Sequence, residues 1–175
     1  MKNLERGYTF IELLAVISIF SVIGIAIVSI LFTTLRGSRK SDLIVTLKQN
    51  GDFAISQMTN NIRYAKSLDT PASCTTPVTT KTITISSATD NGQTTYVCPA
   101  VSTSGITSNS ASLVDTTAVA VTSCDFICTQ QSIFDPPTIN ITFTLTPKNV
   151  NGLPENTGTL PFQTSVTMRN FNYSR

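Results

Sequence analysis

The sequence predicts an α+β protein in which a long N-terminal helix packs on a C-terminal antiparallel β-sheet. Two observations predict this class. The first is an apolar block, Leu13 to Phe32, of twenty residues without a charged side chain; as a helix it would span roughly 30 Å, the thickness of a bilayer core. The second is a change of hydrophobic period beyond Pro71, from that of a helix to that of a strand.

The pattern divides the 175 residues into a leader, an apolar helix, an amphipathic stem and a β head, with the bounds 1–7, 8–35, 36–70 and 71–175. In the stem, apolar or small residues recur every three or four positions and so share one helical face: Leu47, Gly51, Ile55, Met58, Ile62 and Ala65. We expect a single helix from Thr9 to Leu68, ended by Asp69-Thr70-Pro71.

Alternating apolar and polar residues predict five short strands in the head, at 82–86, 94–98, 119–123, 139–145 and 162–168. Asp90-Asn91-Gly92 predicts a hairpin turn between the first two. One face of these strands is apolar and the other rich in Thr, which favours an antiparallel sheet covered on one face by the helix. Segments 99–118 and Asn149–Gly158 are predicted to be exposed loops, the first with little core content.

Four cysteines lie in the head: Cys74, Cys98, Cys124 and Cys128. An even number in a small exported domain indicates two disulfides. Zinc is the competing interpretation, but the chain has no His and no C-x-x-C pair. Cys124 and Cys128 could close a tight loop, leaving Cys74 to pair with Cys98. The pairings 74–124 with 98–128 and 74–128 with 98–124 remain open.

Charge and composition argue against catalysis and against nucleic-acid binding. The net charge is +2, too small to suggest a nucleic-acid partner by itself. Residues 36–66 carry six basic and two acidic side chains, and residues 67–175 carry four and six, so a basic stem joins a mildly acidic head. Without His, Ser-His and Cys-His catalysis is excluded. There is also no phosphate-binding Gly loop and no acidic metal cluster, so we expect no enzyme, metal or cofactor.

The apolar block is too long for the h-region of a signal peptide, and no A-x-A-like site follows it. A plain membrane anchor is the second interpretation. Against it stands Glu12, because a lone carboxylate at the start of a lipid-soluble helix is costly and implies a partner. A cut after Gly7 would create such a partner, since the new α-amino group of Tyr8 would carry a positive charge.

Gly7-Tyr8-Thr9-Phe10-Ile11-Glu12-Leu13-Leu14 resembles the processing signature of type IV prepilins and type II secretion pseudopilins. The resemblance implies cleavage by prepilin peptidase after Gly7, N-methylation of Tyr8, and pairing of Glu12 with the amine of a neighbouring subunit. It implies a single-pass protein of the bacterial inner membrane with its head outside. The partners would be other subunits, the peptidase, an assembly platform and the bilayer, and the destination a pilus or pseudopilus.

Two departures from the family pattern qualify this expectation. Many major pilins have a Pro in the region corresponding to Ser21–Ser29, where this chain has none, which favours a minor pilin or a pseudopilin. The basic residues that follow the span would favour the opposite topology by the positive-inside rule, but the cysteines and the motif argue for an exported head. Two alternatives stay open: a membrane-tethered binding module, and a competence-type pseudopilin for DNA uptake, which only the basic stem supports.

Overall fold

The computed structural model describes residues 8–87, 92–100, 104–148 and 158–171. The chain forms two compact units, residues 1–40 and residues 41–175, called here the N-terminal unit and the head. Helix α1, Phe10–Tyr64, contributes residues 10–40 to the first and residues 41–64 to the second. The predicted α+β class is confirmed, because the helix packs against antiparallel sheets in the head.

Helix α1 ends four residues earlier than the sequence predicts. Residues 65–70 form strand β1, Ala65–Thr70, which pairs antiparallel with β3, Thr82–Ser87. Pairing gives both backbones hydrogen-bond partners, and the Asp69 carboxylate accepts hydrogen bonds from Ser86 Oγ at 2.6 Å and Gln93 Nε2 at 3.0 Å. These cross-strand contacts outweigh the continuation of the helical pattern, so the predicted helix end at Leu68 was wrong.

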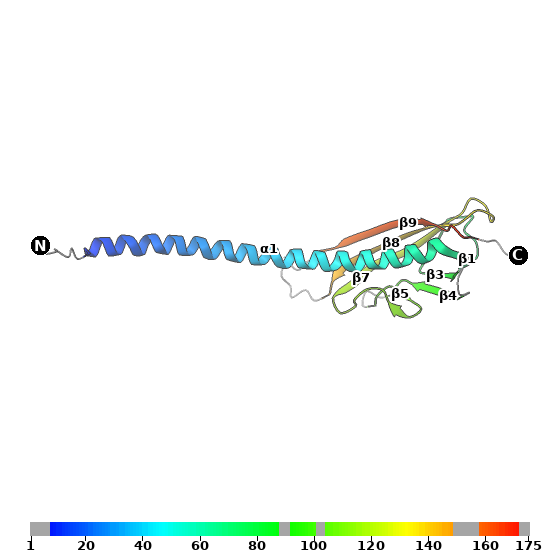
Figure 1. Ribbon diagram of the computed structural model, residues 1–175, viewed down its shortest axis with the longest axis horizontal. Helices are drawn as coiled ribbons and strands as arrows, with labels where there is room; N and C mark the ends of the chain where they lie inside the picture. The colour runs from blue at the N-terminus through cyan, green and yellow to red at the C-terminus, as the bar shows by residue number, and fades with distance from the viewer. Residues whose placement is uncertain (1–7, 88–91, 101–103, 149–157, 172–175) are drawn as a thin grey trace, which may run out of the picture. The chain divides into compact units, whose positions relative to one another are not determined.

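The described residues of the head form two antiparallel sheets where the sequence predicted one. The first has the order β1-β3-β4-β5-β6, and its remaining members are β4 (Gln93–Val97), β5 (Thr107–Ser108) and β6 (Ala111–Ser112). The second has the order β2-β7-β8-β9, formed by β2 (Val78–Thr80), β7 (Val119–Thr129), β8 (Thr138–Pro147) and β9 (Leu160–Thr167). Figure 1 shows β7, β8 and β9 running along the head portion of the helix. All five predicted strands are present, and the chain crosses between the sheets at Lys81, which separates β2 from β3.

One hydrophobic core joins the helix to both sheets. The buried helical residues are Leu47, Gly51, Ala54, Met58 and Ile62. The predicted face is therefore confirmed except that Ala54 is buried and Ile55 only partly so. In β8, buried apolar side chains alternate with polar ones on the opposite face, as period 2 requires. The buried side chains are those of Ile139, Ile141, Phe143 and Leu145.

Gly51 allows the closest helix–sheet approach. A Cβ built on Gly51 would lie 2.0 Å from the tip of the Phe162 ring. That ring stacks on Phe143, with centroids 5.1 Å apart. Glycine is needed here because any larger residue would overlap an aromatic ring that is already held in a stack.

The prediction that segment 99–118 has little core content was wrong. Ile106 is fully buried and Val114 is 5% exposed, so two apolar side chains tie this segment to the core. Between them a tight hairpin joins β5 and β6, with positive φ at Asn109 and Ser110. The Asn109 side chain extends the pairing, because its Oδ1 accepts from Thr95 N at 2.7 Å.

The predicted hairpin between the first two head strands is confirmed by the antiparallel pairing of β3 with β4. Of its expected turn residues, Gly92 accepts a hydrogen bond from Ser87 N at 2.8 Å. Asp90 and Asn91 lie outside the described residues, as does most of the expected loop Asn149–Gly158.

Candidate functional site: the start of the apolar helix

The start of α1 carries the residues that the sequence singles out. Tyr8 precedes the helix and is 88% exposed. Glu12 lies in the first helical turn. Gly7 lies outside the described residues, so the geometry of the expected cleavage bond stays a prediction.

Thr9 and Glu12 form a capping box. The Glu12 Oε2 atom accepts hydrogen bonds from Thr9 N and Thr9 Oγ1, both at 3.1 Å. In return Glu12 N donates to Thr9 Oγ1 at 3.3 Å. Each side chain thereby satisfies a backbone N–H at the helix start, and the negative charge lies at the positive end of the helix dipole.

This box corrects one step of the sequence argument. Glu12 was expected to count against a plain anchor as a lone carboxylate, but it accepts two hydrogen bonds from Thr9 of its own chain, so a plain anchor could use it as well. The signal was present in the sequence, since Thr-x-x-Glu directly before an apolar run is the signature of a capping box. A role for Glu12 in assembly must therefore be separated experimentally from its role in capping.

Beyond this box the helix presents an apolar surface from Leu13 to Phe32, and basic residues follow from Arg36 to Lys40. Every side chain from Tyr8 to Lys40 is exposed. Within the described residues, α1 is the one helix long and apolar enough to cross a membrane. Its polar side chains bond back to the helix, as in Ser21 Oγ to the Ile17 carbonyl at 2.7 Å and Ser29 Oγ to the Ile25 carbonyl at 2.9 Å. The surface is therefore suited to lipid or to other apolar helices.

The four cysteines form the disulfides Cys74–Cys128 and Cys98–Cys124, each with Cα atoms 5.5 Å apart. This is one of the pairings that the sequence left open, and a tight Cys124–Cys128 loop does not form. Both of those residues lie on β7, four positions apart. At about 3.3 Å per residue their Cα atoms would be roughly 13 Å apart, too far for a disulfide.

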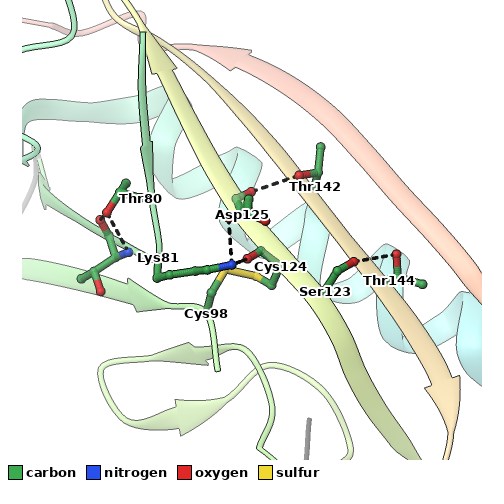
Figure 2. The surroundings of a disulfide bond; sticks show 9 residues. Thr80, Lys81, Cys98, Ser123, Cys124, Asp125, Thr142 and Thr144 are labelled. Atoms are coloured by element: carbon green, nitrogen blue, oxygen red, sulfur yellow. Dashed lines mark hydrogen bonds and ion pairs between the residues drawn. A yellow bond between two sulfur atoms is a disulfide. The ribbon is translucent and has the colours of Figure 1, made fainter. Parts of the chain in front are cut away.

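The disulfides join segments that backbone pairing leaves separate. Cys98 follows β4 of the first sheet, and Cys124 belongs to β7 of the second. Figure 2 shows Lys81 reaching the same place. Its Nζ lies 2.8 Å from Asp125 Oδ1 and also donates to the Cys124 carbonyl. No local pattern in the sequence marks Lys81, because only the fold brings the segment between β2 and β3 beside Cys124 and Asp125 of β7.

Among the described residues of the head, the side chains of Tyr96 and Asp115 have shifted pKa values. Burial raises the pKa of the Tyr96 hydroxyl, and hydrogen bonds with Asn61 and Ser108 offset part of that rise. Hydrogen bonds from the side chain and backbone of Thr117 lower the pKa of Asp115. Both residues connect the sheets or loops of the head to α1. The Tyr96 hydroxyl, on the first sheet, accepts a hydrogen bond from Asn61 Nδ2 of the helix. The backbone N–H of Asp115 donates to Asn50 Oδ1 of the helix.

The site residues thus fall into two separate sets. Tyr8 and Glu12 belong to the N-terminal unit, and all four cysteines belong to the head. In the described ranges, no group of three or more Cys, Asp or Glu side chains could hold a metal ion. The arrangement offers an exposed apolar helix with one capped carboxylate, and a disulfide-bonded head.

The chain matches no protein-family model, no curated protein and no solved structure.

Proposed function

We propose that this chain is a structural subunit, a minor pilin or a pseudopilin, of a type IV pilus-like filament. One observation carries the proposal. An apolar helical segment whose side chains are all exposed from Phe10 to Leu35 begins directly after the sequence Gly7-Tyr8-Thr9, with a single carboxylate in its first turn. Such a surface needs a covering, which lipid supplies before assembly and neighbouring helices supply in a filament.

The proposed mechanism is physical rather than catalytic. Prepilin peptidase removes residues 1–7 on the cytoplasmic side, and the new amine of Tyr8 is methylated. The helix holds the subunit in the inner membrane, with the head outside, until the assembly platform extracts it. Moving an apolar helix from lipid to other apolar helices gains little hydrophobic energy. Close packing and polar groups must therefore determine how neighbouring helices align along the filament.

Glu12 is the polar group that we propose for this selection. Its carboxylate makes the capping box within one subunit. On assembly it would also meet the charged amine of an adjacent subunit. In a medium of low dielectric constant, an unpaired charge is strongly disfavoured and a paired one is stabilised. Misregistered subunits would leave the amine and carboxylate unpaired, and would therefore dissociate.

Three variants separate pairing from capping. Glu12→Gln keeps a capping residue but removes the charge. Glu12→Ala removes both, and Thr9→Ala removes the hydroxyl of the cap while keeping the charge. We expect all three to insert in the membrane, and both Glu12 variants to be lost from sheared filaments while Thr9→Ala is retained. Normal incorporation of Glu12→Gln with loss of Thr9→Ala would show that capping alone matters and would refute the pairing.

A membrane-tethered binding module is the competing function. It predicts that all three variants remain in the membrane fraction and that the chain never appears in filaments. Salt-sensitive binding of DNA would instead support a competence-type role, since phosphate contacts weaken as salt rises. We do not expect it, because the basic residues of the stem are accompanied by Asp42 and Asp52 and the net charge of the chain is only +2.

A further inference from the structure

The turn between β7 and β8 borders an open pocket of about 500 Å³ at one end of the second sheet. This volume lies in the range of roughly 300–1,000 Å³ that is typical of small-molecule sites. Its lining is mixed: Cys74, Pro77 and Pro136 contribute apolar surface, whereas hydroxyl and amide groups come from Thr75, Thr129, Gln130, Gln131 and Thr138. Among the described residues of the lining, the single charged one is Asp135. No Lys or Arg is among the lining residues that the structure describes.

A disulfide, a strand pair and two hydrogen bonds hold parts of the pocket wall in place. The Cys74–Cys128 disulfide holds the segment after β1 against β7. Thr129 pairs with Thr138, which closes the base of the β7–β8 hairpin. Within the turn, Gln130 Nε2 donates to the carbonyls of Ile133 and Asp135. A preformed pocket binds its ligand without the entropic cost of ordering a loop.

The same turn exposes two large apolar side chains. Ile133 is 40% exposed and Phe134, next to the pocket residue Asp135, is 67% exposed. Among the described residues of the head outside α1, Val97 is the only other large apolar side chain that is exposed. Exposed apolar residues are therefore gathered at this turn rather than scattered over the sheets.

The chemistry of the pocket selects one class of ligand. A phosphate, sulfate or sialic acid would meet the Asp135 carboxylate and find no cation in the lining, so anionic ligands are disfavoured. A neutral sugar offers hydroxyl donors for Asp135 and both donors and acceptors for the Thr and Gln groups. Its apolar C–H face suits the apolar part of the lining, which includes Pro77 and Pro136, and the exposed Phe134 directly precedes Asp135 in the same turn. We propose that this pocket binds a neutral oligosaccharide, whether the head belongs to a filament or to a tether.

The test uses the full chain in detergent and an array of oligosaccharides ending in glucose, galactose or N-acetylhexosamine, with sialylated and sulfated glycans beside them. We expect retention of one or more neutral glycans and no preference for charged ones. The neutral glycan retained best is then titrated by calorimetry. Phe134→Ala and Asp135→Asn should each weaken its binding by about tenfold or more, and Phe134→Tyr should restore most of the affinity.

Phe53→Ala and Asp52→Asn are the matched controls, because both side chains are exposed on α1. They should leave the affinity unchanged within roughly twofold, as expected for surface residues outside a site. The proposal is overturned if no neutral glycan binds at about 1 mM, if charged glycans are preferred, or if binding survives loss of the Phe134 ring. Binding of unstructured peptides in place of glycans would also overturn it.

Discussion

Two portions of the same helix differ in what covers their apolar side chains. Residues 10–40 of α1 are exposed throughout, whereas residues 41–64 bury Leu47, Ala54, Met58 and Ile62 in the head core. The apolar face of the second portion is covered by the sheets of its own chain. The apolar side chains of the first portion require lipid or other chains to cover them. Changes in the head should therefore alter the stability of the head, and changes in the first portion should leave the head stable and alter the helix itself and its associations.

The largest expected effect follows removal of a disulfide. Replacing Cys98 and Cys124 by Ala should cost the head about 3–4 kcal/mol, because the open loop gains conformational freedom in the unfolded chain. Removing Cys74–Cys128 should cost about 0.6 kcal/mol more, since its sequence separation of 54 is about twice the 26 of the other bridge. Hydrogen exchange followed by mass spectrometry, in detergent, measures head and span peptides separately.

Span peptides from residues 10–40 are the internal control of that experiment. They should keep their protection in both variants, because no disulfide lies in the N-terminal unit. Equal loss of protection in both units would contradict the separation of the two portions.

The three described glycines of α1 give the second test. Gly51→Ala should destabilise the head by about 1–3 kcal/mol, because its new Cβ would meet the Phe162 ring. Gly24→Ala and Gly37→Ala meet no atom within 4 Å and should stabilise the helix by about 0.5–1 kcal/mol through the better helix propensity of Ala. Urea unfolding in detergent measures the first, and helical circular dichroism measures the others.

A stable Gly51→Ala head would show that the ring of Phe162 moves aside at no cost, and that the approach of helix and sheet is looser than the contact indicates. Gly24→Ala has a further use. It should leave the single subunit unharmed, so any loss of filament incorporation would report a contact between helices.

A smaller effect is expected at the crossover between the sheets. Lys81→Met should lower the unfolding free energy by about 1 kcal/mol or less, because the ion pair with Asp125 is more than a third exposed and water screens it. The matched variant Lys148→Met removes an exposed Lys that also donates to a backbone carbonyl, that of Thr116. Chemical denaturation midpoints compare the two. A loss of several kcal/mol for Lys81→Met alone would show that the crossover depends on the lysine.

The smallest effect concerns pH. The pKa of Asp115 is below its ordinary value of 3.8 in the folded chain. Its ionised form is thus favoured by folding, and this contribution is present above pH 3.8 and is lost as the pH falls through the folded pKa. Asp115→Asn should therefore be less stable than the parent near neutral pH, with a difference that shrinks in acid. A difference independent of pH would show that the charge plays no part.

Much of this fold could be predicted from local patterns. The helical face in the stem and the five main strands follow from hydrophobic period, which depends only on which side chains must be buried. The two sheets could not be predicted in this way, because β2 has only three residues and β5 and β6 only two each. Strands of two or three residues are too short to show an alternating hydrophobic pattern. Their position depends on pairing with residues distant in the sequence.

The cysteine pairing shows where periodicity misleads. Val119 and Val121 point inward, but a bulge between Val121 and Ser123 shifts the register, so that Cys124, Phe126 and Cys128 are the inward residues that follow. Without the bulge, the alternation set by Val119 and Val121 would place Cys124, Phe126 and Cys128 on the outward face. Residues 124–128 therefore resemble a loop when only the sequence pattern is considered. The Thr9–Glu12 capping box differs from the cysteine pairing, because its signature, Thr-x-x-Glu before an apolar run, is visible in the sequence and could have been predicted.

The central claim is that the chain is processed to begin at Tyr8 and then assembled through its exposed helix. Mass spectrometry of the intact protein, purified from the membrane of a host with prepilin peptidase, tests this most directly. The account predicts a chain of residues 8–175 carrying one methyl group on the Tyr8 amine, and an unprocessed chain when Gly7 is replaced by Val. An intact chain that retains Met1 to Gly7 in the presence of active peptidase would contradict it.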